Sequence, residues 1–173
     1  PGRLPALDAV IHLAGESIAG GRWTEARKAA IRHSRVVGTR QLAASLAALP
    51  VRPKALLCAS AVGFYGTGQE PVTEDSGPGR GFLADVCQAW EQAAGPAADA
   101  GLRVAHLRIG LVVSPAGGLL RLLLPLFTAG LGGSVGSGTQ GMSWIGLDDV
   151  VGAFHHVLQH ESLGGPVNVT APE

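Results

Sequence analysis

Short, mostly apolar runs alternate along this chain with longer segments in which apolar residues recur every three or four positions. The apolar runs cover residues 9–13, 55–60 and 104–109, and each ends in small or polar residues. Runs of this length and composition are typical of strands buried on both faces of a parallel sheet. The pattern therefore predicts three parallel strands joined by helices.

The segments between and after these runs have helical spacing or turn residues. Thr24 can cap a helix that continues to about Leu49, just before Pro50. A second helix is predicted over 82–94, where Gly95-Pro96 interrupts it. Further along, we expect a short, very apolar helix over 119–127, a glycine-rich loop over 130–141, a strand over 143–145, a helix from Asp148 to about Gln159 and a last strand over 167–169.

Strands separated by helices of this length imply right-handed crossovers, which predict an α/β fold with a parallel sheet and helices on both faces. Ligands of such sheets bind beyond the carboxyl ends of the strands. The three predicted strands end at residues 15–17, 60–61 and 108–110. We expect these positions to line one crevice.

Length and charge narrow the classes of function. The 173 residues are enough for one globular domain, and 13 basic residues balance 13 acidic ones. No basic stripe is available for a phosphate backbone, so we expect no nucleic-acid partner. Cys58 and Cys87 lack a metal-ligand spacing and are interpreted as buried free thiols.

We also expect no contact with a membrane. The longest apolar run, Leu119–Leu126, is interrupted by Arg121 and Pro125 and is far shorter than the roughly 20 residues of a spanning helix. The first residues, Pro1–Pro5, do not have the charged-then-apolar plan of a signal peptide. These observations favour a cytoplasmic protein.

Five motifs in this order resemble those of a known family: His12-Leu13-Ala14-Gly15-Glu16, Ser34-Arg35-Val36-Val37-Gly38-Thr39, Ser60-Ala61-Val62-Gly63-Phe64-Tyr65-Gly66, Leu107-Arg108-Ile109-Gly110 and Ser143-Trp144-Ile145-Gly146-Leu147-Asp148-Asp149-Val150. Together they are similar to atypical extended short-chain dehydrogenases/reductases of the NAD-dependent epimerase/dehydratase type, often labelled nucleoside-diphosphate-sugar epimerases. The resemblance covers nearly the whole chain. It implies a Rossmann-like sheet that binds NADP(H), with NAD as the alternative cofactor.

Members of that family begin with a strand, a glycine-rich phosphate loop and a helix, and no such unit is apparent at the start of this sequence. The resemblance implies that residue 1 lies near the family's fourth strand and that further helices follow Asn168–Glu173. We therefore expect a single partial domain, with a sheet and helix core over 1–110 and a substrate-side portion over 111–173. A missing N-terminal segment or another chain is expected at the open edge of the first strand, and cofactor binding is expected to need it.

The superfamily's usual tyrosine and lysine, four residues apart, are absent, and Leu83 and Cys87 stand at the matching place. Ser60 matches the catalytic serine or the residue before it, and Tyr65 is a candidate acid. The alternatives are a serine that ends a strand and a packing tyrosine.

The same resemblance implies cofactor contacts at Ala14, Gly15, Glu16, Ser60, Arg108 and Gly110, and substrate contacts at Gln140 and Trp144. Several have a structural alternative, which for Ala14 and Gly15 is a plain turn that ends the strand. Glu16 can be a solvated carboxylate, Arg108 can form a salt bridge to a helix, and Trp144 can belong to the core. No metal site is predicted, because Asp148 and Asp149 suit a helix start and His156 and His160 lack a third ligand.

Three functions remain open at this point. The first is an NADP(H)-dependent oxidoreductase or epimerase-like protein acting on a small carbonyl compound or a sugar nucleotide. The second is a catalytically silent nucleotide-binding or sensing module. The third is a serine hydrolase, because residues 132–136 fit the GxSxG pattern around Ser134.

Overall fold

The computed structural model describes residues 6–19, 21–68, 70–134 and 136–172. Its main sheet has four parallel strands in the order β1-β2-β3-β6, which are β1 (Ala9–His12), β2 (Ala55–Ala61), β3 (Arg103–Ile109) and β6 (Gly165–Val169). A smaller parallel pair consists of β4 (Leu111–Val113) and β5 (Trp144–Gly146). The parallel arrangement confirms the predicted α/β, Rossmann-like fold.

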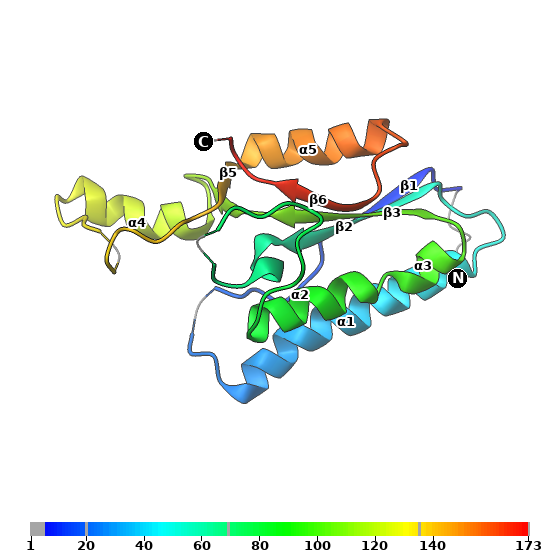
Figure 1. Cartoon of the computed structure of the whole chain (residues 1–173), viewed down its shortest axis with the longest axis horizontal. Coiled ribbons are helices and arrows are strands. Elements are labelled where there is room, and N and C mark those ends of the chain that lie inside the picture. Colours follow the sequence, from blue (N-terminus) through cyan, green and yellow to red (C-terminus); the bar gives the residue numbers. More distant parts are fainter. Residues whose placement is uncertain (1–5, 20, 69, 135, 173) are drawn as a thin grey trace.

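Helices cover both faces of the main sheet (Figure 1). One face carries α1 (Glu25–Ala47), α2 (Phe82–Gln92) and α3 (Gly95–Asp99), and the other carries α5 (Leu147–Gln159). A short 3-10 turn, η1 (Val62–Tyr65), follows β2, and α4 (Gly118–Thr128) projects away from the sheet. None of the helices in the described part of the chain is long and apolar enough to cross a membrane.

The predicted elements lie close to the observed ones. Thr24 caps α1 as expected, since its hydroxyl accepts a hydrogen bond from the Arg27 amide at 3.3 Å. The interruption after α2 is followed at once by α3, with a proline in its first turn. The strand β4 was not predicted, because only Gly110 separates it from β3 and the two read as one apolar run.

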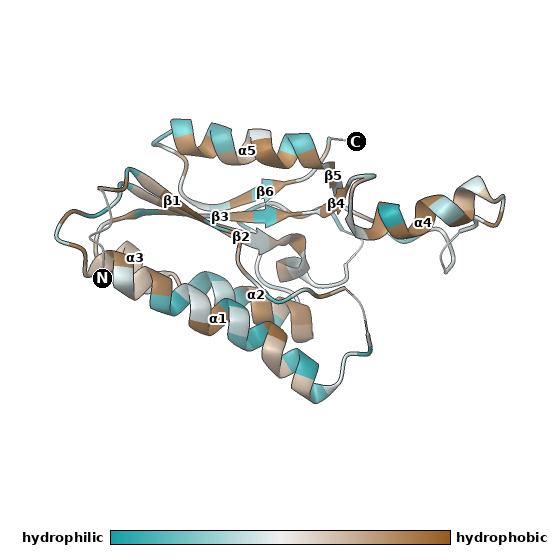
Figure 2. Cartoon of the chain, turned by 180° about the vertical axis from the view of Figure 1, so that it is seen from behind, coloured by the Kyte–Doolittle hydropathy of each residue, from teal (hydrophilic) through white to brown (hydrophobic). Residues whose placement is uncertain are grey.

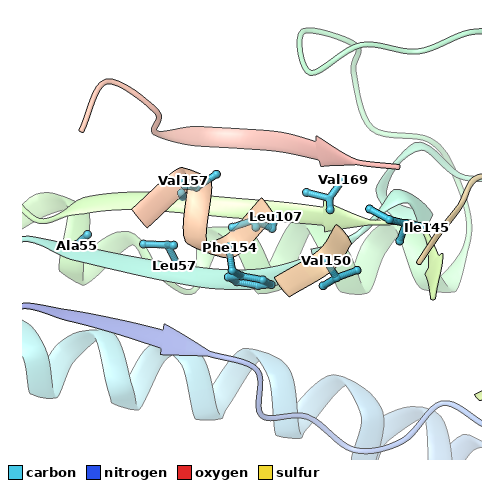
Figure 3. Packing of buried hydrophobic residues seen from close by; sticks show 9 residues of the cluster. Ala55, Leu57, Leu107, Ile145, Val150, Phe154, Val157 and Val169 are labelled. Atoms are coloured by element: carbon cyan, nitrogen blue, oxygen red, sulfur yellow. The ribbon is translucent and has the colours of Figure 1, made fainter. Parts of the chain in front are cut away.

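Successive side chains of a strand point to opposite sides of the sheet. Because helices cover both sides, both sets of side chains are buried. Leu57 and Leu107 pack against Val150, Phe154 and Val157 of α5, as Figure 3 shows. The alternate positions of β2 pack on the other side, against α1, α3 and their neighbours, in a second cluster that contains Ala43, Leu46, Leu56, Cys58, Ala94, Ala97 and Leu102. Both cysteines are buried and free, as predicted.

Two apolar surfaces are left open in the described chain. Along β1, which pairs only with β2 among the described strands, Ile11 and the following Leu13 are 46% and 62% exposed. The second surface is α4, which has no buried residue; Figure 2 shows its apolar residues on a helix that stands apart from the sheet. The division of the chain at residues 110 and 111 remains a prediction.

Candidate functional site

The parallel register brings the ends of three strands together. Ser60 on β2 lies beside Arg108 on β3, which in turn lies beside Asn168 on β6. Since all strands of this sheet run the same way, their carboxyl ends share one edge with the loop that follows β1. Ligands of parallel sheets bind at this edge, so these residues define the candidate site.

Arg108 is paired inside the fold. Its Nε and Nη2 donate to Oε1 and Oε2 of Glu91 on α2, both at 2.9 Å, and the side chain is only 5% exposed. Ser60 also donates to Glu91 Oε1, at 2.7 Å. Burial alone would lower the pKa of Arg108, but its hydrogen bonds to Glu91 and Tyr65 and their charges outweigh burial and raise it.

Tyr65 belongs to the same network. Its hydroxyl accepts from Arg108 Nη1 at 2.8 Å and donates to Asn168 Oδ1 at 2.7 Å. The guanidinium of Arg108 also lies over the ring of Phe64, 3.5 Å from its centre. The structure therefore gives both Ser60 and Tyr65 partners within the protein, and a role for either in catalysis remains a proposal.

The loop after β1 is held by side chains of α1. The amide of Glu16 donates to Ser34 Oγ at 2.9 Å, and Arg35 Nη1 donates to the Glu16 carbonyl at 2.8 Å. Gly15 lies directly against the Arg35 guanidinium: a methyl group added at Gly15 would come within 3.2 Å of Cζ. Ala14, Gly15 and Glu16 are exposed at this edge, where a ligand can reach them.

Leu83 and Cys87, which were predicted to stand where the superfamily has its tyrosine and lysine, lie on α2 and pack toward Gly63 in η1. Burial, reinforced by the charge of Glu91, raises the pKa of the Cys87 thiol to about 11. A thiol of this kind stays protonated at neutral pH. Neither residue therefore supplies the usual acid or cation.

The substrate-side residues are more dispersed. Trp144 on β5 is 47% exposed. In the loop before β5, Ser137 Oγ donates a hydrogen bond to Gln140 Oε1 at 3.3 Å. Gly110 packs against the Ser143 carbonyl, where an added methyl group would come within 2.9 Å. The need for glycine at 110 thus has a structural cause, and any cofactor contact remains a prediction.

Two further candidate sites from the sequence are the GxSxG motif and the histidine pair at the end of α5. The GxSxG motif includes Val135, which lies outside the described residues, and no finding supports a serine hydrolase. His156 and His160 stack at 3.9 Å, and no cluster of three metal ligands occurs in the described chain.

Glu91, Asn168 and Arg35 were not predicted as site residues. They are charged or polar residues on α2, β6 and α1, and only the folded arrangement brings them to the strand ends. The motif that includes Arg35 was the one signal available.

The comparisons with known proteins agree with the fold. The sequence profile described as NAD dependent epimerase/dehydratase family matches residues 3–170. The chain is 47% identical to "Epimerase family protein Mb2239" of Mycobacterium bovis over 173 residues, which is 99% of this chain and 57% of that protein. It therefore spans little more than half the length of this relative.

Two solved structures show the same fold. One is human epimerase family protein SDR39U1 (isoform2) with NADPH, at a TM-score of 0.92 and 33% identity over 98% of this chain and 59% of that one. The other is the nucleoside-diphosphate sugar epimerase from Corynebacterium glutamicum, at a TM-score of 0.83 and 42% identity over 96% and 35%.

Proposed function

The chain belongs to the NAD dependent epimerase/dehydratase family, and from this premise we propose that it forms part of the ligand crevice of an NADP(H)-dependent oxidoreductase or epimerase-like protein. The observation that carries the proposal is the shared edge of β1, β2 and β3, where the loop after β1 and the ends of β2 and β3 meet. The human relative with the same fold was crystallised with NADPH, which favours NADP(H) over NAD. A small carbonyl compound or a sugar nucleotide is the proposed substrate.

The residues at the end of β1 fit a nicotinamide cofactor. Ala14 and Gly15 have small side chains and are exposed, so their backbone lets a planar ligand approach closely. The exposed Glu16 offers a carboxylate for a ribose hydroxyl. When bound, the nicotinamide supplies or accepts a hydride.

The phosphate-binding part of such a site needs a further segment. β1 is a short apolar strand whose outer edge has no partner among the described strands, and exposed edges of this kind recruit other strands. We propose that a further segment of the protein, or another chain, pairs with this edge and carries the phosphate loop.

The second candidate function is a nucleotide-binding module without turnover. It is favoured by one observation, namely that Leu83 and the protonated Cys87 occupy the place of the usual acid and base. Tyr65 does not replace them freely, because its hydroxyl is held between Arg108 and Asn168.

Equilibrium binding of NADPH and NADH, measured alongside turnover on a protein that contains both this chain and the segment that pairs with β1, separates these functions. An oxidoreductase binds NADPH and consumes it with a carbonyl substrate, which lowers the absorbance at 340 nm. An epimerase restores its cofactor in every cycle, so its turnover is followed by chromatography of the UDP-sugar. Saturable NADPH binding without turnover on either substrate class identifies the silent module. Absence of binding to both cofactors contradicts both functions.

A further inference from the structure

Arg35 and Arg108 both lie at the site, but they differ in whether an opposite charge is paired with the guanidinium. Arg35 lies on α1, and its side chain is only partly buried. Nη1 donates to the carbonyls of Glu16 and Ile31, at 2.8 and 3.4 Å. Both partners are neutral, so the guanidinium charge is not compensated by them.

Arg108 provides the comparison within the same molecule. Its Nε and Nη2 form a two-pronged pair with the carboxylate of Glu91. The corresponding Nε and Nη2 of Arg35 make no hydrogen bond, and no carboxylate lies within 4.0 Å of it, among the residues that the structure describes. The edge of the guanidinium that recognises oxyanions is thus filled in Arg108 and unfilled in Arg35.

Arg35 is held in place while that edge is open. Its Cζ lies 5.0 Å from the centre of the Trp90 ring, and Gly15 packs against the guanidinium at the end of β1. Burial lowers the pKa of Arg35, and the nearby charges of Cys87 and Glu16 offset this effect only in part. A partly desolvated, immobilised guanidinium gains most from an anionic partner, because little entropy is lost and the charge is neutralised.

We propose that Arg35 binds an anionic oxygen group of the ligand, a phosphate or a carboxylate, through its Nε and Nη2. The site lies at the end of β1, and of the two arginines whose charges reach Cys87 on α2, Arg108 is already paired with Glu91. That the anion belongs to a cofactor or substrate rests on the proposed function. The anion-binding property itself does not.

The first experiment uses inorganic phosphate as the probe and compares wild type with Arg35→Gln. Binding is measured as the shift in unfolding temperature during a phosphate titration at constant ionic strength. Arg40→Gln is the matched control, because Arg40 is an exposed arginine on the same helix. We expect Arg35→Gln to weaken phosphate binding about tenfold or more and Arg40→Gln to leave it unchanged.

Arg35→Lys guards against a loss of folding in the glutamine variant. Lysine keeps the positive charge but lacks the planar fork, so phosphate affinity should lie between those of wild type and Arg35→Gln. Equal phosphate affinity in all variants, or no phosphate binding by wild type, overturns the proposal.

An NADPH titration of the same variants, made in a protein that also contains the segment paired with β1, identifies the source of the anion. A parallel loss of NADPH affinity in Arg35→Gln assigns the site to a cofactor phosphate. Unchanged NADPH affinity with lost phosphate binding assigns it to the substrate. Phosphate binding that depends on Arg35, in a protein that binds neither NADPH nor NADH, supports the anion site while refuting the proposed function.

Discussion

The carboxylate of Glu91 and the guanidinium of Arg108 meet in a two-pronged ion pair, with both oxygen-to-nitrogen distances at 2.9 Å. The pair joins α2 to β3 within the candidate site and holds Ser60 and Tyr65 through further hydrogen bonds. Removing one member leaves the other charge buried without its partner. The orientation of the strand ends therefore depends on this pair.

Glu91→Gln is expected to lower the free energy of unfolding by about 3 kcal/mol, because it removes the counter-charge of a buried guanidinium. Urea denaturation measures the change. Glu161→Gln is the control, because it removes one member of the exposed pair with Lys54, at 3.9 Å, and should change stability by less than about 0.5 kcal/mol. Similar decreases in the free energy of unfolding for the two variants would show that the pair of Glu91 with Arg108 stabilises the fold no more than the exposed pair does.

Thr39 connects β1 to α2 through one buried hydroxyl. Trp90 Nε1 donates to Thr39 Oγ1 at 2.9 Å, which leaves the Thr39 proton available to His12 Nε2, also at 2.9 Å. Thr39→Val keeps the shape of the side chain but leaves both partners without their hydrogen bond. We therefore expect the free energy of unfolding, measured by urea denaturation, to fall by about 2 kcal/mol. Ser45→Ala removes an exposed hydroxyl from the same helix and should cost much less. If Thr39→Val lowers the free energy of unfolding no more than Ser45→Ala does, the Thr39 hydroxyl does not connect β1 to α2 in the way described.

Two histidines predict a dependence of stability on pH. Burial lowers the pKa of both His12 and His106 below 6.5. Below that pH the unfolded chain binds protons that the folded chain excludes, so the free energy of unfolding should fall as the pH drops from about 7 toward the folded values.

His106→Leu tests this directly, because the Nδ1 atom of His106 is buried without a hydrogen-bond partner in the described structure. The variant should lose less stability than wild type between about pH 7.5 and about pH 5.5, as followed by urea denaturation. His33→Gln, at an exposed position on α1, should retain the wild-type slope. If the free energy of unfolding changes with pH equally in wild type and His106→Leu, His106 does not contribute to the pH dependence.

A pair of glycine substitutions tests the backbone around the site. A methyl group added at Gly79 would overlap the carbonyl of Tyr65, so Gly79→Ala should destabilise the protein and displace η1. Gly152 lies inside α5 with open space around it, and Gly152→Ala should raise stability by about 0.5–1 kcal/mol. Thermal unfolding distinguishes the two signs, and a tolerated Gly79→Ala would mean that this loop can move.

Local patterns were sufficient to predict the strands but not their side-chain partners. The apolar runs at 55–60 and 104–109 predicted β2 and β3 because both faces of these strands are covered. Arg108 was assigned either to a phosphate or to a salt bridge, since its partner Glu91 lies on a separate helix and no periodicity connects them. The same long-range geometry hid the contact between Gly15 and Arg35, which only the crossover through α1 creates.

The central claim is that the ends of β1, β2 and β3 form a nicotinamide-binding edge. Amide chemical-shift mapping during titration with NADPH, on a protein that also contains the segment paired with β1, tests it most directly. The account predicts that the largest shifts fall on the amides of Gly15, Glu16, Ser60 and their neighbours at the carboxyl ends of the strands. Saturable shifts confined to residues far from that edge, or no shifts at all, would contradict it.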